Sequence, residues 1–162
     1  MSNGATTFVP MKVAIVMGSG SDRSVMEKAA QMLDRFGIET EVRVLSAHKT
    51  PDQAIAFAAS AAGAGFGVII AGAGKAAHLA GVMAAKSLLP VIGVPLSASL
   101  NGLDALLSTV QMPTGIPVAT VAVDGAANAA LLAVAILALG DPELTTKLAQ
   151  YRRELAEETL KA

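Results

Sequence analysis

The only two histidines of the chain stand in short loops that also contain a lysine. His48 precedes Lys49 in the segment Ser46-Ala47-His48-Lys49-Thr50-Pro51, directly after an alternating apolar run. A neighbouring cation and a helix N-terminus favour a neutral imidazole, which can take up and return a proton near pH 7. This position favours a catalytic role for His48 over that of a structural histidine bonded to the backbone.

The residues that follow His48 predict the start of a helix. Thr50 suits the N-cap position, Pro51 suits the first helical position, and Gln53 completes a capping box with Thr50. We therefore expect His48 and Lys49 to lie beside the free N–H groups at the positive end of a helix. Lys49 is open to two interpretations, a solvated surface charge or a partner of a phosphate.

A second loop, Gly18-Ser19-Gly20-Ser21-Asp22, has the chemistry of a phosphate site. It offers two hydroxyls, small residues and the backbone N–H groups of a helix start. A tight turn with an ordinary cap explains the same residues equally well. The loop is neither a Walker loop nor a G-x-G-x-x-G fingerprint. Asp22 either caps the following helix or holds sugar hydroxyls.

A third loop runs from Gly72 through Gly74 and Lys75 to His78. Its glycines indicate a close approach of the backbone to a ligand, or only a tight turn. For His78, a place in the core and a place in a site are equally compatible with the sequence.

Composition excludes several kinds of site. The chain has no cysteine, so disulfides, zinc–thiolate centres and thiol catalysis are excluded. Two histidines without clustered carboxylates make a poor metal site, and no G-x-S-x-G motif supports a serine hydrolase. The net charge of −1, with lysine and arginine scattered, gives no indication of a nucleic-acid partner.

The apolar pattern predicts a three-layer α/β/α domain with a parallel sheet of five strands that alternate with helices. Strand patterns cover residues 11–17, 39–45, 68–71, 90–94 and 118–123, and the final helix begins at Pro142. Continuous apolar residues favour a central place for 68–71, whereas alternation favours an edge for 39–45. Because parallel strands end at one edge, the three loops should meet there, with the first two facing each other.

The chain is 53% hydrophobic with a mean hydropathy of +0.57, so a membrane segment must be considered. The charge-free stretch 53–74 contains Gly63, Gly65 and Gly67, and it is better interpreted as helix, turn and strand than as a span. Residues 1–10 are expected to form a polar tail without a signal pattern, ahead of a single domain over 11–162. We therefore expect a cytoplasmic protein. The helix at 126–139, apolar on every face, predicts contact with other subunits.

Several segments together resemble the family of 5-(carboxyamino)imidazole ribonucleotide mutase, a small enzyme of purine biosynthesis. The resemblance covers roughly residues 13–139. The matching segments follow one another in the family's order: 17–22 (MGSGSD), 46–51 (SAHKTP), 71–74 (AGAG), 77–79 (AHL), 90–95 (PVIGVP), 103–107 (LDALL), 110–113 (VQMP) and 117–120 (PVAT).

The resemblance implies a flavodoxin-like fold and a homo-octamer with active sites at subunit contacts, without a metal or an organic cofactor. The substrate would be an aminoimidazole ribonucleotide whose carboxyl group leaves as carbon dioxide and adds again at a ring carbon. His48 would move the protons. The other implied roles are phosphate binding by Ser19, Ser21 and Lys49, ribose binding by Asp22, and further substrate contacts by Ser46, Gly74, Lys75 and His78.

Three positions depart from the commonest pattern of the family. Lys49 replaces an arginine, Lys75 replaces a glycine, and Ala80 replaces a proline. Arginine and lysine bind phosphate differently, so the phosphate geometry is affected. A sister class that carboxylates the aminoimidazole ribonucleotide directly tends to have cations at the first two positions. That class generally lacks His78 and the segments 93–95 and 110–113, so the sequence predicts the mutase.

Two other classes of protein compete with an enzyme as interpretations of this sequence. A flavodoxin-like module that binds FMN or a free nucleotide usually stacks the ring on aromatic side chains, but this chain has no tryptophan and one tyrosine, Tyr151. A purely structural oligomer would leave His48 and the serine loop unexplained.

Overall fold

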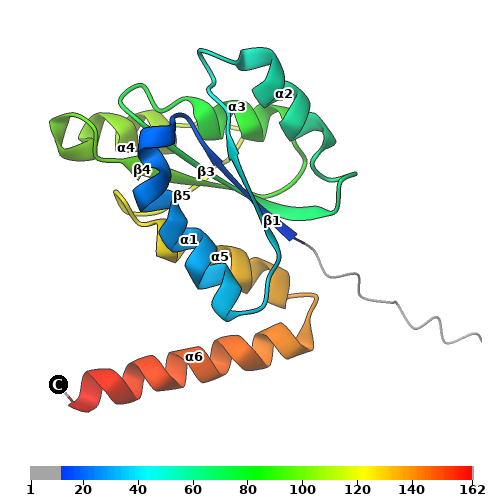
Figure 1. The fold of residues 1–162 in the computed structure, drawn as a ribbon, viewed down its shortest axis with the longest axis vertical. Helices are drawn as coiled ribbons and strands as arrows, with labels where there is room; N and C mark the ends of the chain where they lie inside the picture. Colours follow the sequence, from blue (N-terminus) through cyan, green and yellow to red (C-terminus); the bar gives the residue numbers. More distant parts are fainter. Residues whose placement is uncertain (1–11, 162) are drawn as a thin grey trace, which may run out of the picture.

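The computed structural model describes residues 12–161 (Figure 1). Met11 and the polar tail expected over residues 1–10 lie outside this range. The strands are β1 (Lys12–Met17), β2 (Thr40–Val44), β3 (Phe66–Gly74), β4 (Val91–Leu96) and β5 (Ala119–Thr120). The helices are α1 (Arg23–Arg35), α2 (Pro51–Ser60), α3 (Leu79–Lys86), α4 (Leu103–Val110), α5 (Ala126–Ala138) and α6 (Pro142–Lys161), with short 3₁₀ turns at Gly20–Asp22 and Leu100–Gly102.

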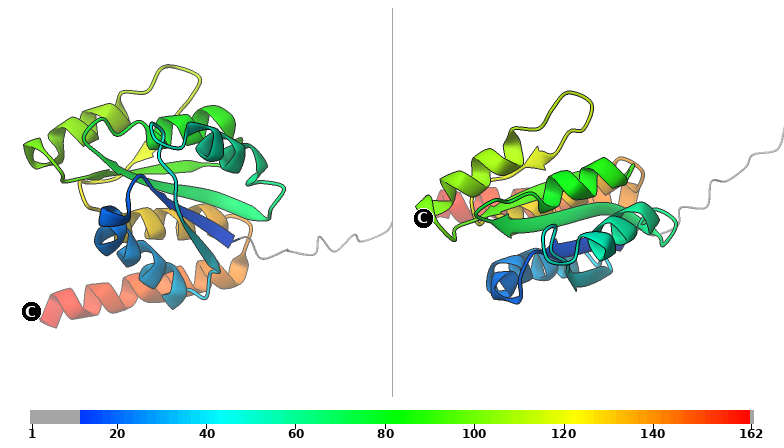
Figure 2. Two further views of the ribbon diagram at one scale, coloured as in Figure 1. Left: turned by 45° about the horizontal axis from the view of Figure 1, so that its top comes forward. Right: turned by 90° about the horizontal axis from the view of Figure 1, so that it is seen from above.

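All five strands are parallel and follow the order β2-β1-β3-β4-β5. β3 lies at the centre and β2 at an edge, which confirms both placements made from the sequence. Figure 2 shows helices on both faces of the sheet. Along β1, Ile15 and Met17 pack toward α1 and α5, whereas Ala14 and Val16 pack toward α2 and α3. This alternation explains why a central strand must be apolar on both faces.

The fifth strand is shorter than the sequence predicts. Only Ala119 and Thr120 pair with β4 in the ladder, instead of the whole stretch 118–123. Val121 still donates its N–H to the Gly93 carbonyl, but at Asp124 the backbone adopts a left-handed conformation with φ 57°. The Asp124 side chain accepts a hydrogen bond from the Ser97 N–H at 2.9 Å. The chain directly after the stretch 118–123 is therefore tied to the loop after β4 instead of extending the sheet.

Helix α5 is covered in large part by its own chain, which the sequence did not predict, and contact of its half-buried positions with other subunits stays a prediction. Residues of α1, α6 and the sheet pack around Ala129, Ala133 and Leu137, and Asn128 is the exposed position within the helix. The sequence pattern identified a buried helix correctly. It could not show that α6 would return across the same face.

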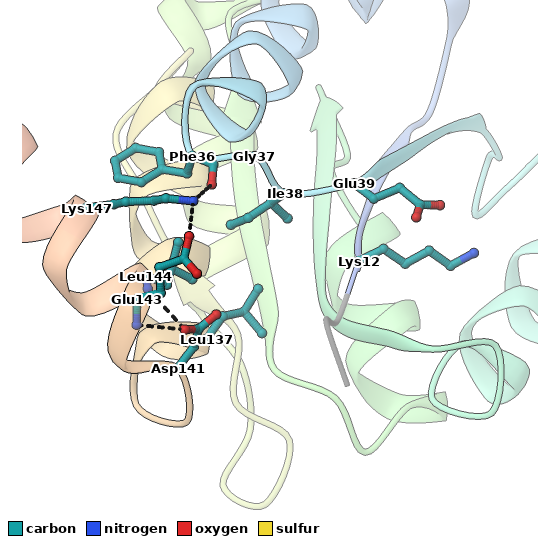
Figure 3. A pocket seen from close by; sticks show the side chains of 10 residues that line it. All are labelled: Lys12, Phe36, Gly37, Ile38, Glu39, Leu137, Asp141, Glu143, Leu144 and Lys147. Atoms are coloured by element: carbon teal, nitrogen blue, oxygen red, sulfur yellow. Dashed lines mark hydrogen bonds and ion pairs between the residues drawn. The ribbon is translucent and has the colours of Figure 1, made fainter. Parts of the chain in front are cut away.

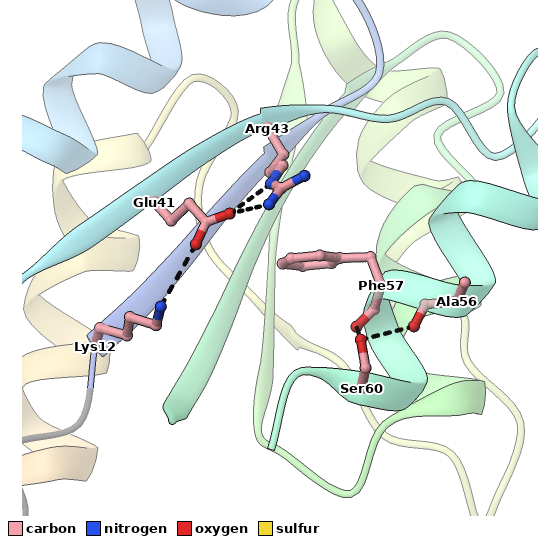
Figure 4. A network of polar contacts seen from close by, with 6 residues as sticks. All are labelled: Lys12, Glu41, Arg43, Ala56, Phe57 and Ser60. Atoms are coloured by element: carbon pink, nitrogen blue, oxygen red, sulfur yellow. Dashed lines mark hydrogen bonds and ion pairs between the residues drawn. The ribbon is translucent and has the colours of Figure 1, made fainter. Parts of the chain in front are cut away.

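Charged side chains protect the outer part of edge strand β2 (Figure 4). Glu41 accepts a hydrogen bond from Arg43 and lies 3.5 Å from the ammonium of Lys12, and the Arg43 guanidinium lies 5.6 Å from the ring of Phe57. The bond from Arg43 lowers the pKa of Glu41 below its usual value. Charges on an edge strand oppose pairing with the edge of another sheet.

Candidate functional site

A cavity of about 340 Å³ opens beyond the carboxyl ends of four neighbouring strands. The loops after β1, β2, β3 and β4 all contribute to its wall, as expected for a sheet of this topology. It contains all nine site residues predicted from the sequence: Ser19, Ser21, Asp22, Ser46, His48, Lys49, Gly74, Lys75 and His78. The expectation that the first two loops face each other is therefore confirmed. The functions of the nine residues remain predictions.

A second hollow of about 420 Å³ lies at a different place, between the Phe36–Glu39 segment and the start of α6 (Figure 3). Several of its polar groups already have partners within the chain. Lys147 pairs with Glu143 at 2.9 Å and donates to the Phe36 carbonyl at 3.5 Å, and the carboxylate of Asp141 caps α6. This hollow is a junction between elements, so volume alone does not identify the site.

The His48 loop is closed by its first and last residues. Thr50 Oγ1 accepts from the Ser46 N–H at 2.8 Å and donates to the Ser46 carbonyl at 3.2 Å. Ser46 Oγ, which is nearly buried, accepts from the N–H groups of His48 at 3.3 Å and Lys49 at 3.0 Å. These four bonds fix the backbone from which the His48 and Lys49 side chains project.

The predicted capping box is wrong in one respect. Thr50 occupies the N-cap position of α2 and Pro51 the first turn, but the Thr50 side chain makes no cap hydrogen bond. Its hydroxyl is used on Ser46, four residues earlier, because the loop turns back on itself there. The local pattern placed the helix start correctly without revealing the competing partner.

The two histidines meet across the cavity. His48 Nε2 lies 2.8 Å from His78 Nδ1, and the rings are edge to face with centroids 4.8 Å apart. In such a contact one nitrogen donates and the other accepts, so a single proton lies between the rings. The pair can therefore hold a proton at one ring while the other acts as its acceptor. The place of His78 in the site, which the sequence left open, is thus given by the structure.

The serine loop leaves polar groups directed at the cavity. Ser21 Oγ donates to Ser19 Oγ at 2.9 Å, and both side chains line the wall. Asp22 makes no side-chain cap hydrogen bond to α1, which argues against its simple capping role. Partial burial raises the pKa of Asp22, and this effect outweighs the hydrogen bonds from Ser19 and Ser21 and the charge of Lys49, which lower it. Such a carboxylate is suited to accept hydroxyl donors from a ligand.

The glycines of β3 have a packing role that the sequence did not reveal, and their close approach to a ligand stays a prediction. A Cβ on Gly72 would lie 2.3 Å from the sulfur of Met26, so this glycine admits α1 onto the sheet. A Cβ on Gly74 would lie 2.8 Å from Cβ of Ala98 in the loop after β4. Gly74 lines the cavity because it brings that loop close, and β3 continues through both glycines.

Sequence reasoning missed the contribution of β4. Ala98, two residues beyond this strand, lines the cavity, and nearby Ser99 donates a hydrogen bond to Asp104 at the start of α4. That bond lowers the pKa of Asp104, and the backbone N–H of Ala105 and the charge of Lys75 act in the same direction. The position of Ala98 directly after a central strand was the available signal, but an alanine has no chemistry to draw attention to it.

Within residues 12–161, no three side chains of the His, Asp and Glu types gather closely enough to hold a metal ion. No helix in that range is both long and apolar enough to cross a membrane. The polar side chains on the cavity wall are a histidine pair, two lysines, serine hydroxyls and one carboxylate.

This strand order, with helices on both faces and a site at the carboxyl edge, defines a flavodoxin-like α/β protein. The sequence matches the family described as AIR carboxylase over residues 12–158, and the chain belongs to that family. The N5-carboxyaminoimidazole ribonucleotide mutase of Pyrococcus abyssi is 57% identical over 145 residues, which cover 89% of this chain and 83% of the relative.

Two further relatives extend the comparison. The chloroplastic phosphoribosylaminoimidazole carboxylase of Vigna aconitifolia is 51% identical over 92% of this chain, which corresponds to 27% of that longer protein. The crystal structure of PurE from Treponema denticola superposes with a TM-score of 0.84 at 34% identity and covers 92% of this chain and 94% of that one. One of these two sequence relatives is named a mutase and the other a carboxylase.

Proposed function

We propose that this protein converts 5-(carboxyamino)imidazole ribonucleotide to 5-amino-4-carboxyimidazole ribonucleotide in purine biosynthesis. The contact between His48 and His78, inside a cavity that also holds the serine loop, is the observation that carries the proposal. The relatives that bear the mutase name, including the one from Pyrococcus abyssi, give independent support.

The proposed reaction requires two proton movements at one place. In its protonated form, His48 gives a proton to the exocyclic nitrogen as the bond from nitrogen to the carboxyl carbon breaks and carbon dioxide forms. The ring carbon then attacks the carbon dioxide, and His48 removes the proton from that carbon. His48 thus recovers from the ring carbon the proton that it gave to the exocyclic nitrogen. The substrate is isomerised, and His48 returns to its starting protonation state.

The other residues hold the substrate during these steps. In this proposal Ser19, Ser21 and Lys49 bind the phosphate, and Asp22 accepts hydrogen bonds from the ribose hydroxyls; their common place on the cavity wall supports these roles. Ser46 acts mainly through the His48 loop, because its hydroxyl accepts two backbone hydrogen bonds. Retention of carbon dioxide requires a site closed to solvent, which the exposed positions of His48 and His78 do not provide in one chain.

The direction of carboxyl transfer tests the proposal. The carboxyamino ribonucleotide should be consumed without added bicarbonate, whereas the uncarboxylated ribonucleotide should react only at high bicarbonate. The assay supplies each substrate separately and follows the ring-carboxylated product by its absorbance. The reverse preference would assign the protein to direct carboxylation, the second candidate, which Lys49 and Lys75 favour.

We further propose that the protein works as a homo-octamer. Four large apolar side chains along α4 and the 3₁₀ turn before it are exposed in the single chain: Leu100, Leu103, Leu107 and Val110. They adjoin the loop that carries Ala98 and Ser99, so a neighbouring chain could cover them and close the cavity mouth. Sedimentation should show a closed assembly, most simply of eight chains. A stable monomer at micromolar concentration would contradict this proposal.

A further inference from the structure

The cavity contains two lysines, one on each histidine loop. Lys49 follows His48, and Lys75 precedes His78 by three residues. Within residues 12–161, neither ammonium lies within 4 Å of a carboxylate, whereas Lys12 and Lys147 do. The site therefore presents two lysines that form no ion pair within the described residues.

The two lysines lie on loops that follow different strands, β2 for Lys49 and β3 for Lys75, and strand β1 separates these strands in the sheet. The charge of Lys49 acts on Asp22, which belongs to the serine loop after β1. The charge of Lys75 acts on Asp104, at the start of α4 after β4. A ligand that spans the cavity would thus meet one cation at each side.

The backbone of Lys75 adds a second observation. Its φ is 57°, in the left-handed region that favours glycine and disfavours a side chain. The chain nevertheless has a lysine at this position, on the wall of the cavity and without a carboxylate partner. Strained positions of this kind cluster at ligand sites, where a contact with the ligand explains the residue.

The substrate of the proposed reaction has two anionic groups, a phosphate at one end and the carboxylate that migrates. The hydroxyls and N–H groups of the serine loop suit the phosphate, and Lys49 is the cation on that side. The carboxylate must lie at the histidine pair, because its bond to nitrogen breaks there. Lys75 is the remaining cation, on the same loop as His78.

We propose that Lys75 binds the migrating carboxylate, while Lys49 and the serine loop bind the phosphate. This assignment rests on the proposed function. It makes Lys75 a specificity residue that distinguishes carboxylated from uncarboxylated ribonucleotides, and it gives each anionic group of the ligand one cation.

The test measures two ligands with five variants by isothermal titration calorimetry at one ionic strength. The ligands are the uncarboxylated aminoimidazole ribonucleotide, which has only the phosphate, and the ring-carboxylated product, which has both anions. Lys75→Met should weaken binding of the carboxylated ligand by roughly tenfold or more. The affinity of this variant for the uncarboxylated ligand should stay within about twofold of that of the unchanged protein. Lys49→Met should weaken the binding of both ligands by a similar factor.

Lys86→Met is the matched control, because Lys86 is exposed in the last turn of α3 and lies outside the cavity wall. It should change neither affinity. Lys75→Gly removes the charge and also relieves the strain of the left-handed backbone, so it should lose affinity for the carboxylated ligand alone, as Lys75→Met does. Lys75→Arg keeps the charge and should retain most of the preference for the carboxylated ligand.

Three results would overturn the assignment. They are an equal loss of affinity for both ligands in Lys75→Met, unchanged affinities for both ligands in that variant, or an affinity for the carboxylated ligand in Lys75→Gly as high as in the unchanged protein. The first would place Lys75 at the phosphate, the second would make it a solvated charge, and the third would make backbone conformation the cause. If the unchanged protein binds neither ribonucleotide, the proposed function fails and this assignment with it.

Discussion

Replacement of His48 by asparagine should lower turnover by about a hundredfold to ten-thousandfold and leave ribonucleotide binding nearly unchanged. Asparagine has a similar reach and can still form hydrogen bonds, but it cannot accept and return a proton. The backbone of the loop is held by Ser46 and Thr50 rather than by the imidazole, so the fold of the loop should survive. The loss is therefore expected in the chemical step.

Turnover of the carboxyamino ribonucleotide, calorimetric affinity for the ring-carboxylated product and the melting temperature should be measured on the same preparation. Lys86→Met serves as the control for handling, since its side chain lies outside the cavity wall. Turnover that stays within about threefold of the unchanged protein would remove His48 from the mechanism. A large fall in affinity with normal turnover at saturation would make it a binding residue instead.

The sequence predicted the sheet and the edge at which the site lies, because these follow from local patterns. The apolar run at 68–71 is at the centre and the alternating run at 39–45 is at the edge, as expected. A parallel strand that ends at Met17 or Val44 necessarily delivers the loop that follows it to the carboxyl edge of the sheet. For this reason all nine candidate residues line one cavity, although they come from three separate loops.

What the sequence could not predict depends on contacts between distant residues. His48 and His78 are 30 positions apart, and no local spacing reports that their nitrogens meet at 2.8 Å. The hydroxyl of Thr50 had two possible partners, a helix N–H and the Ser46 backbone, and only the fold of the loop decides between them. The cover that α6 provides for α5 was hidden for the same reason.

The second large effect concerns the packing of α4, the helix that follows the Ala98 loop. Gly93 lies buried in β4, and a Cβ there would lie 2.3 Å from Cγ2 of Thr109, 3.0 Å from Cγ1 of Val118 and 3.3 Å from Cβ of Ala80. Gly93→Ala should therefore destabilise the protein by about 3 kcal/mol, because a β-branched residue of α4 cannot turn away. At this size, that loss lowers the melting temperature by roughly 6 to 12 °C.

A double variant tests whether Thr109 is the cause. Thr109→Ser removes Cγ2 and keeps the hydroxyl that donates to the Ala105 carbonyl at 2.7 Å. The double variant Gly93→Ala/Thr109→Ser should therefore be more stable, by about 1 kcal/mol or more, than the sum of the two single losses of stability predicts. A coupling of this size is typical of residues in contact. Gly63→Ala is the control, since the nearest atom to its Cβ would be the Ser60 oxygen at 3.6 Å. If the stability losses of the two single variants simply add, α4 shifts as a whole. Because the Ser99–Asp104 hydrogen bond joins α4 to the loop after β4, such a shift should also weaken ribonucleotide binding.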